Sequence, residues 1–321
     1  MYLSELAQTL PAQIREGYNM GRAIDLPKTI TAILCVGMGG SVFGADIVQA
    51  LSREWLSVPL IIHRDYTVPA WVNENTLVVL LSFSGTTEEV LEVAKNVSRR
   101  TPHIIVSAAG GPLLTHAQGQ HLTTLPFSPP DDLRTCGRFG FGYSFGVVIA
   151  IAEMYQTQAQ QISDTLNTTR SVTPETSIME WCDTEKELCI LSAEHLNGNA
   201  RLFAHQVHET LKRHAVWYSL PEANHHLLES FADPSMKQRR FVFLSSTHYH
   251  PRNQKRLELT ADLLAALGHK TQVFTLPNTS RLEEVLQYTF LSTTITAEIA
   301  QRRALEPSKM AMVERFKAAL G

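Results

Sequence analysis

The chain has 321 residues, roughly twice the usual size of a single domain, so we expect two domains and a sizeable core. Its formal charge of -3 and its pI near 6.5 argue against nucleic acid or an anionic membrane as a partner, because both select basic surfaces. The four cysteines lie far apart without CxxC spacing, so neither a disulfide framework nor a zinc cluster is indicated. A small-molecule partner and a cytoplasmic location fit these features.

Two segments could be mistaken for an export signal or a membrane span, and neither has the features that such a segment needs. The opening stretch "MYLSELAQTLPAQIREG" carries Glu5 where a signal peptide needs an unbroken apolar run. The stretch "FGFGYSFGVVIAIA" has 14 residues, which is too short to span a bilayer and predicts a buried helix. We therefore expect a soluble, unprocessed protein.

Short apolar runs alternate with helical patterns in both halves of the chain, which predicts parallel sheets covered by helices. After an N-terminal helical segment, strands are expected at 31–37, 59–63, 76–82 and 103–108, and helices at 41–53, 86–98 and 141–155. The polar stretch 156–180 is predicted to hold a connector or surface helix and the domain boundary. Strands then return at 187–193, 215–219, 240–246 and 271–276. The prediction is an α/β fold with two similar domains, 1–155 and 156–321, each with four or five parallel strands.

A glycine cluster, "GMGGS" at 37–41, follows the first predicted strand. Glycines at a strand-to-helix turn let the backbone approach a ligand, and the amides of the helix start attract anions. A dinucleotide fingerprint would need glycine where Val42 stands, and the acidic Asp65 comes too late for it. No GK[ST] follows, which argues against a P-loop. A tight turn that binds nothing, with Ser41 as a helix cap, is the alternative.

The motif "SFSGTTEE" at 82–89 places four hydroxyl side chains between a fully apolar strand and an amphipathic helix. They should lie at the carboxyl edge of the sheet, where open α/β folds bind ligands. Hydroxyl donors at a helix N-terminus suit a phosphate monoester, and the absence of Lys and Arg favours a small, exchangeable one. A capping box based on Ser84 or Thr86 explains one or two of the hydroxyls and leaves the others unexplained.

Together these motifs resemble the first sugar isomerase (SIS) domain of the bifunctional phosphoglucose/phosphomannose isomerases. The similarity continues through "CGRFGFGYSFG" (136–146), "HETLKRHAVWYSLPEANHH" (208–226), "HPRNQKRLELT" (250–260) and the closing "LEPSKMAMVERFKAALG" (305–321). The resemblance implies two SIS domains, each an α/β/α sandwich with a parallel sheet, in a homodimer with shared active sites. It also implies cofactor-free, metal-free isomerisation between glucose 6-phosphate and fructose 6-phosphate, with mannose 6-phosphate often accepted.

The resemblance assigns the catalytic groups. Aldose–ketose isomerisation needs a base that moves a carbon-bound proton between C1 and C2, and Glu209 stands at the family's glutamate position. His225 matches a ring-opening histidine that the neighbouring subunit contributes, and His226 replaces the asparagine that usually follows it. Arg138 matches an arginine that stabilises the enediolate. Lys317 matches a lysine that contacts the substrate near the ring oxygen or C1.

The phosphate ligands are assigned in the same way. The hydroxyls would come from Ser82, Ser84 and Thr87, with nearby amides from Gly39, Gly40 and Ser41. The chain departs from the family pattern at two places. Thr86 replaces an asparagine, which is conservative for hydrogen bonding, whereas Cys136 and Gly137 replace two prolines before Arg138. The role that the family gives to a C-terminal hydroxyl in mannose phosphate conversion would fall to Ser308.

The sequence lacks the features that three other functions would require. His205 and Glu209 lie four residues apart, as metal ligands on a helix could, but neither HExxH nor HxxEH is present. A SIS-type sugar-phosphate sensor would usually carry a DNA-binding helix-turn-helix, for which the residues before the first strand are too few and too acidic. A glucosamine 6-phosphate synthase would need an attached glutaminase, which this sequence lacks.

Overall fold

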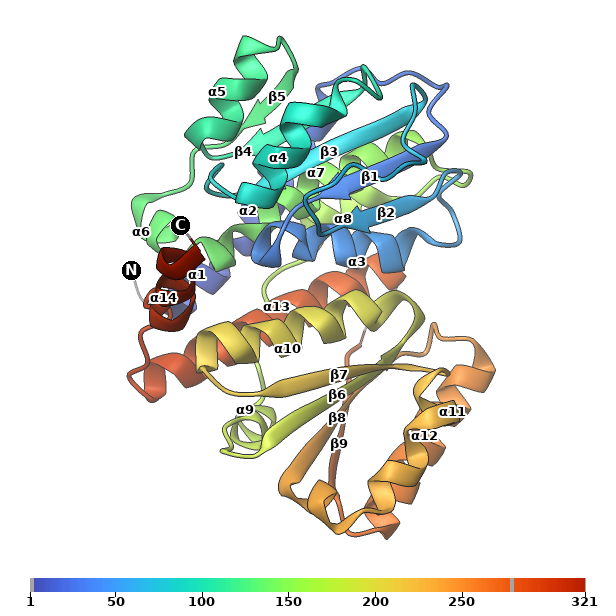
Figure 1. Ribbon diagram of the computed structural model, residues 1–321. Helices are drawn as coiled ribbons and strands as arrows, with labels where there is room; N and C mark the ends of the chain where they lie inside the picture. Colours follow the sequence, from blue (N-terminus) through green and yellow to red (C-terminus); the bar gives the residue numbers. More distant parts are fainter. Residues whose placement is uncertain (1–2, 278–279, 321) are drawn as a thin grey trace. The chain divides into compact units, whose positions relative to one another are not determined.

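The computed structural model describes residues 3–277 and 280–320 and contains two parallel sheets, each flanked by helices (Figure 1). Contacts divide the chain into two compact units. The five-stranded unit comprises Thr9–Arg170, and the four-stranded unit comprises Met1–Gln8 together with Ser171–Gly321. The predicted α/β class with four or five parallel strands in each half is therefore confirmed.

The sheet of the five-stranded unit has the order β2-β1-β3-β4-β5, with every pair parallel. Its strands are β1 (Ala32–Val36), β2 (Leu60–His63), β3 (Thr76–Ser82), β4 (Ile104–Ala108) and β5 (Thr123–Pro126). β1, β3 and β4 are buried along their whole length, because helices cover both faces, and this explains their continuous apolar sequences. β5 was not predicted, since its residues "TTLP" form a short edge strand with only Leu125 buried.

Two helical layers cover this sheet. The core formed with α4 and α5 includes Val36, Leu80 and Val106, which point to one face of their strands. α2 and α7 pack closely with each other, and α7 also packs on α3. The bounds are α2 (Leu10–Arg22), α3 (Phe43–Ser52), α4 (Glu88–Val97), α5 (Gly111–Gly119), α6 (Asp131–Thr135), α7 (Phe141–Met154) and α8 (Ile162–Thr168). The α2–α7 contact needs glycine, because a Cβ at Gly17 would lie 2.2 Å from the carbonyl oxygen of Tyr143.

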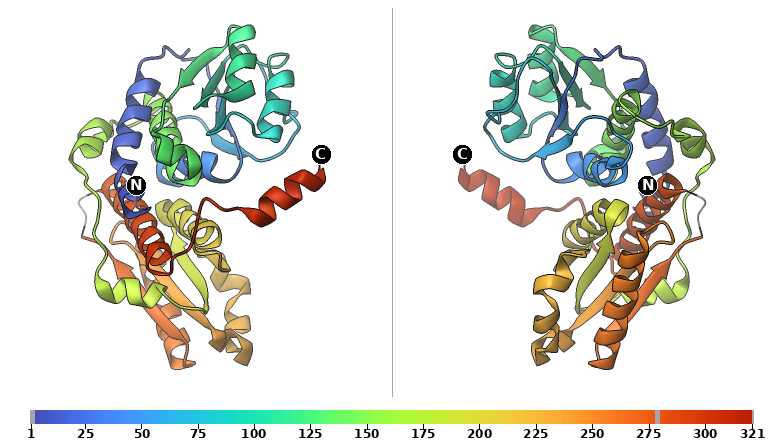
Figure 2. Two further views of the ribbon diagram at one scale, coloured as in Figure 1. Left: turned by 90° about the vertical axis from the view of Figure 1, so that its left-hand side faces the viewer. Right: turned by 90° about the vertical axis from the view of Figure 1, so that its right-hand side faces the viewer.

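The sheet of the four-stranded unit has the order β7-β6-β8-β9, again all parallel. Its strands are β6 (Glu187–Ala193), β7 (Ala215–Leu220), β8 (Arg239–Ser245) and β9 (Lys270–Thr275). α10 (Asn197–Leu211) and α13 (Arg281–Arg302) pack together on one side, and α12 (Pro251–Ala266) lies along the other (Figures 1 and 2). The remaining helices are α1 (Leu3–Gln8), α9 (Thr176–Cys182), α11 (Ala223–His226) and α14 (Ala311–Leu320).

The predicted strand ends agree with the observed ones to within one residue. The chain passes from one unit to the other between Arg170 and Ser171, within the polar stretch 156–180 that was predicted to hold the boundary, although the expected domains were divided after residue 155. α8 stays with the five-stranded unit because it packs on α2, and the amide of Ser57 donates to the carbonyl of Tyr155 at 2.8 Å. α1 packs on α13 and so joins the four-stranded unit. Contacts between distant parts of the chain, which local composition does not reveal, set this division.

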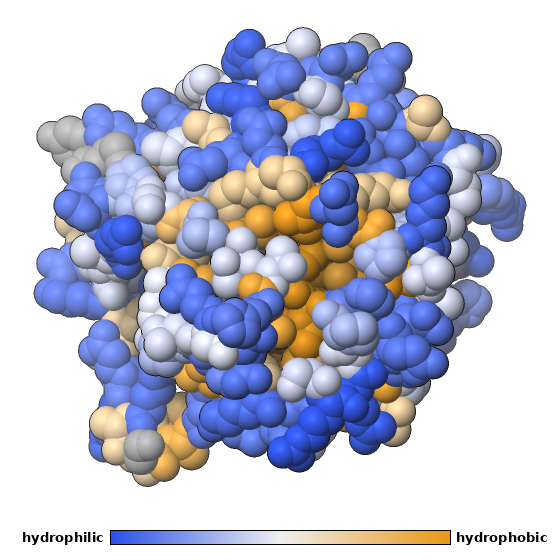
Figure 3. Space-filling view, turned by 90° about the horizontal axis from the view of Figure 1, so that it is seen from above, coloured by the Kyte–Doolittle hydropathy of each residue, from blue (hydrophilic) through white to orange (hydrophobic). Residues whose placement is uncertain are grey.

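The helices and the surface differ in how they distribute apolar residues. Among the described residues, no helix combines the length and the apolar content that crossing a bilayer requires. The face seen in Figure 3 is mostly covered by hydrophilic side chains, with apolar ones gathered in a hollow near its centre.

Candidate active site

The carboxyl ends of β1 and β3 mark the topological switch point of the five-stranded sheet, since β2 lies on one side of β1 and β3 on the other. Open α/β sheets bind ligands at such a point. β1 runs into the glycine turn (residues 37–41) and the 3-10 helix η1 (Gly39–Val42), and β3 runs into the hydroxyl loop (residues 82–87). The amide of Phe83 donates to Ser41 Oγ at 3.0 Å, so one hydrogen bond ties the two segments together.

Four hydroxyls of the hydroxyl loop form two pairs. Ser82 Oγ lies 2.8 Å from Thr87 Oγ1, and Ser84 Oγ lies 2.8 Å from Thr86 Oγ1. Each pair uses one of its two hydroxyl protons internally and leaves the other for a ligand. Ser84 and Thr86 are exposed and Thr87 is half-buried, so these donors can reach a ligand from solvent.

The backbone of the loop adds amide donors. Gly85 adopts a φ of +69°, and a Cβ there would lie 1.8 Å from the carbonyl oxygen of Gly110, so only glycine fits. Its amide donates to Ser82 Oγ at 3.0 Å, which gives the buried Ser82 a structural role in the turn. Thr87 precedes α4 without capping it. The first amides of α4 therefore point toward the loop and carry the partial positive charge that attracts anions.

Arg138 lies at the same edge of the sheet. It belongs to the 3-10 helix η2 (Gly137–Gly140), which precedes α7. A Cβ at Gly40 would lie 3.4 Å from the Cα of Arg138, so the backbone of η2 packs against the glycine turn. The structure thus brings together, within one unit, the predicted phosphate ligands and the predicted enediolate arginine.

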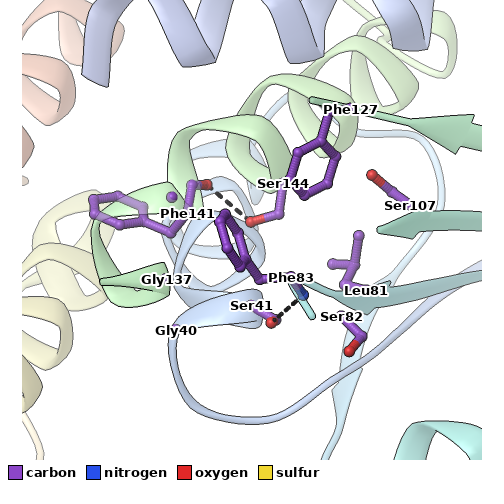
Figure 4. A pocket seen from close by; sticks show the side chains of 11 residues that line it. Gly40, Ser41, Leu81, Ser82, Phe83, Ser107, Phe127, Gly137, Phe141 and Ser144 are labelled. Carbon is purple, nitrogen blue, oxygen red and sulfur yellow. Dashed lines mark hydrogen bonds between the residues drawn. The ribbon is translucent and has the colours of Figure 1, made fainter. Parts of the chain in front are cut away.

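Phe83 links the hydroxyl loop to η2, a role that sequence reasoning missed. Its ring fills the space over two glycines, because a Cβ at Gly137 or Gly140 would lie 2.8 or 2.1 Å from ring carbons (Figure 4). Phe127 lies beyond it, with ring centroids 5.5 Å apart, and stacks on Tyr143 at 4.3 Å. The sign of this packing in the sequence was the pair Gly137 and Gly140, which flank Arg138.

A small cavity lies among these aromatic and hydroxyl side chains. Ser41, Ser82, Ser107 and Ser144 contribute to its lining, and its volume is about 10 Å³. A space of this size holds at most one water molecule. The cavity is therefore packing beneath the hydroxyl loop, and the exposed Ser84 and Thr86 lie outside its lining.

Glu209 and His225 both belong to the four-stranded unit but lie at opposite ends of β7. Glu209 is half-buried in the last turn of α10, and the neighbouring His208 donates through Nε2 to the carbonyl of Ala215, at the start of β7, at 2.7 Å. His225 is exposed on α11, beyond Leu220 at the end of β7. Six residues of strand span roughly 17 Å. The last turn of α10 and the helix α11 are thus separated by the length of β7 (Figure 1).

The sequence left open whether His225 or its neighbour His226 is the predicted ring-opening histidine. The surroundings of the two residues on α11 differ. His226 Nδ1 lies 3.6 Å from the Glu222 carboxylate, whereas His225 has no such acidic partner on its helix in the described structure. α11 is fixed on α12 by Asn224, whose Nδ2 donates to Thr260 Oγ1 at 2.9 Å. The exposed imidazole of His225 is thus presented by an anchored helix.

Lys317 lies on α14, which has no buried residue and extends away from the other helices of its unit (Figure 2). The segment before α14 is tethered: Lys212 Nζ donates to the carbonyl of Lys309 at 2.8 Å. Lys212 follows α10 directly in a left-handed conformation. The segment just before α14, the helix of Lys317, therefore lies beside the C-terminal end of α10, the helix of Glu209.

The metal alternative receives no support from the geometry. Over residues 3–277 and 280–320, no three side chains of His, Cys, Asp or Glu are placed so that they could hold a metal ion. His208, which lies between His205 and Glu209 on α10, donates through Nε2 to the carbonyl of Ala215.

Comparison with known proteins agrees with this geometry. Residues 182–320 match the family model of the bacterial phospho-glucose isomerase C-terminal SIS domain. A bifunctional phosphoglucose/phosphomannose isomerase of Caldicellulosiruptor bescii is 25% identical over 336 aligned positions, covering 98% of this chain and 97% of that protein. Residues 182–320 carry the C-terminal SIS domain of the bacterial phospho-glucose isomerases, and the chain as a whole is similar to bifunctional phosphoglucose/phosphomannose isomerases. The resemblance found in the sequence motifs is thereby confirmed.

One further relative and one solved structure are also similar to this chain. A D-glucosamine-6-phosphate 4-epimerase of Sulfolobus acidocaldarius is 29% identical over 70% of this chain and 72% of its own length. The C-terminal domain of the glucosamine-fructose-6-phosphate aminotransferase of Francisella tularensis superposes with a TM-score of 0.71 at 15% identity, over 95% of this chain and 97% of that one. The second likeness supports the SIS fold in both units.

Proposed function

We propose that this SIS-family phosphosugar isomerase interconverts glucose 6-phosphate and fructose 6-phosphate, with mannose 6-phosphate as a second aldose substrate. The observation that carries the proposal is the pair of hydroxyl–hydroxyl contacts in front of α4, each with a proton left for an anion. A phosphate monoester has the charge and the acceptor oxygens that such a site selects. A nearby family member carries the same activity in its name.

The phosphate would be held without a cation. No Lys or Arg stands in residues 82–89, so hydroxyls and backbone amides must supply the contacts. Hydrogen bonds to a charged group are worth about 1.5–3 kcal/mol each. Three or four of them give affinity enough for a metabolite while allowing the product to leave.

Glu209 would be the base, as the family resemblance implies. Its carboxylate takes the C2 proton of the open-chain aldose while O1 gains a proton, which forms a cis-enediol. The same proton then returns to C1 as O2 loses its own, so the carbonyl has moved and no electron acceptor is consumed. Arg138 would stabilise the negative charge on the enediol oxygens. Lys317 would contact O5 or O1 at the ring-opening stage.

The ring-opening histidine would come from a second copy of the chain. Glu209 and His225 lie at opposite ends of β7, so a single sugar cannot contact both from one chain. A closed two-fold dimer would solve this by placing each His225 in the site of its partner. This supports the homodimer with shared sites that the family resemblance implies.

The principal alternative is an isomerase that acts on another phosphosugar. The relative at 29% identity is named as a 4-epimerase of D-glucosamine 6-phosphate, which would change the configuration at C4 and leave the C1 carbonyl in place. A non-catalytic sugar-phosphate binder is a further alternative. All three share the phosphate site and differ in what the other residues do.

The experiment that separates them is an assay of purified protein with glucose 6-phosphate, coupled to detection of fructose 6-phosphate. We expect turnover by the wild type and its loss in Glu209→Gln, while that variant still binds fructose 6-phosphate. Glu229→Gln, which alters an exposed glutamate of the same unit, is the control and should retain activity. No turnover by the wild type, or unchanged turnover by Glu209→Gln, would refute the proposal, and a C4 epimer as product would favour the alternative.

A further inference from the structure

The two units repeat one topology, so their ligand-binding points can be compared. β6 corresponds to β1 and β8 to β3, because the strand orders β7-β6-β8-β9 and β2-β1-β3-β4 match position by position. The four-stranded unit therefore has its own switch point between the carboxyl ends of β6 and β8. The start of α12 stands there in the place that α4 has in the other unit.

Glu194 occupies the position of Gly39 at this second switch point. Each is the first residue of the 3-10 helix that follows the first strand of its unit, η1 for Gly39 and η3 (Glu194–Leu196) for Glu194. Their φ values are +49° and +46°, and an extended residue precedes both. Glycine adopts this left-handed conformation at little cost, whereas glutamate does so at a penalty. A side-chain role for Glu194 must offset it.

The Glu194 carboxylate lies at the first turn of α12. Its Oε1 accepts from the amide of His250 at 2.8 Å and from Asn253 Nδ2 at 2.7 Å. His250 stands at the N-cap position of α12, where its Nδ1 accepts from the amide of Arg252 at 3.1 Å, whereas Thr87 at the N-cap position of α4 makes no such side-chain hydrogen bond. An anion held at the second helix would meet the same donors that Glu194 now uses.

The loop after β8 resembles the hydroxyl loop of the five-stranded unit in its backbone hydrogen bonding, but larger side chains stand beside it. The amide of His248 donates to Ser246 Oγ at 2.9 Å, as the amide of Gly85 donates to Ser82 Oγ at 3.0 Å. His195 stands where Gly40 stands in the other unit, and it is 2% exposed. Its Nε2 lies 2.7 Å from Glu284 Oε2, to which Ser246 also donates at 2.6 Å. Side chains thus stand at both positions where the five-stranded unit has glycine.

We infer that the four-stranded unit carries a second oxyanion site that is permanently occupied by the chain's own Glu194 carboxylate. Each chain consequently takes up one phosphate, in the five-stranded unit, although it contains two sites of the same architecture. The inference rests on the phosphate site of the proposed function. It also explains the left-handed glutamate, since the carboxylate replaces the missing ligand at the N-terminus of α12.

The test counts inorganic phosphate bound per chain by equilibrium dialysis of the full-length protein. We expect one for the wild type and two for Glu194→Gly, which removes the internal carboxylate and restores the residue of the other unit. Glu194→Gln should still bind one, because its amide oxygen and side chain keep the position filled. Circular dichroism checks that each variant is folded, and Glu194→Ala serves in place of the glycine variant if that one does not fold.

A second background separates this inference from the proposed function. Ser84→Ala/Thr87→Val should abolish the site of the five-stranded unit and leave no bound phosphate, and adding Glu194→Gly should restore one. Folded Glu194→Gly and Glu194→Ala proteins that gain no phosphate would overturn the inference, as would a wild type that binds two. A wild type that binds none would instead contradict the phosphate site of the five-stranded unit, while the triple variant would still decide the role of Glu194.

Discussion

The Ser82 hydroxyl lies 2.8 Å from the Thr87 hydroxyl while it accepts the amide of Gly85. A buried serine thus orients an accessible threonine through a direct contact. The two residues end a strand and precede a helix, so their side chains meet only because the loop between them turns back at Gly85. This arrangement separates the residues that shape the loop from those that face a ligand.

Replacing the accessible hydroxyls should weaken substrate binding more than it slows chemistry. Thr87→Val and Ser84→Ala each remove a hydrogen bond to a charged group, worth about 1.5–3 kcal/mol, so KM should rise roughly 10- to 150-fold with a smaller change in kcat. Ser82→Ala should raise KM and also lower the urea midpoint, because the buried hydroxyl holds the turn. Thr115→Val, at an exposed position of α5, is the matched control. A KM equal to that of the control would remove these hydroxyls from the site.

The fit of Phe83 over Gly140 should be visible as a coupling energy. Gly140→Ala forces a methyl group into the ring and should cost about 1–3 kcal/mol in the free energy of unfolding. In a Phe83→Leu background the ring is gone, so the same substitution should cost less. Urea denaturation of the four proteins measures this cycle. Gly119→Ala, which has no atoms within 4 Å of the added methyl, should be nearly neutral, and strictly additive effects would contradict the contact.

The strands were predictable from sequence for a physical reason. β3 is buried over all seven of its residues and β6 over the last six of its seven, and local hydrophobicity identifies such runs without knowledge of the partners. β5 was missed because an edge strand of four residues needs no apolar pattern. The place of α1 in the four-stranded unit was not expected, because α1 joins that unit through its contact with α13, far along the chain.

The candidate site was also predictable only in part, and for the same physical reason. The hydroxyls of residues 82–87 are contiguous in sequence, so their clustering was predictable from one motif. The packing of Phe83 on Gly140 joins residues more than 50 positions apart, and no local pattern indicates it. Glu194 was equally hidden, because its left-handed φ and its contact with His250 follow from tertiary structure. Sequence therefore indicated the predicted ligand donors and missed the residues that pack around them.

A shared active site predicts that two inactive variants complement each other. Glu209→Gln and His225→Ala should each abolish isomerisation as homodimers. In a mixed dimer, one site combines both intact residues and the other combines both defects. Equal mixing and subunit exchange should then recover about a quarter of the wild-type activity. Mixing two Glu209→Gln preparations is the control. Failure to recover activity, with exchange demonstrated by differently tagged subunits, would place both residues in one chain's site.

Stability should fall at alkaline pH because buried thiols resist ionisation. Burial, assisted by the nearby Asp46 carboxylate, raises the pKa of Cys35 to about 12, whereas the thiol of an unfolded chain has a pKa near 8.5. Its contribution is therefore complete below about pH 8.5 and is lost as the pH rises toward 12, by at most about 1.4 kcal/mol per pH unit. Urea unfolding at pH 8, 9 and 10 should show a shallower decline for Cys35→Ala than for the wild type. Val36→Ala removes neighbouring packing without a titratable group and should keep the wild-type slope, so equal slopes in all three proteins would exclude the thiol as the cause.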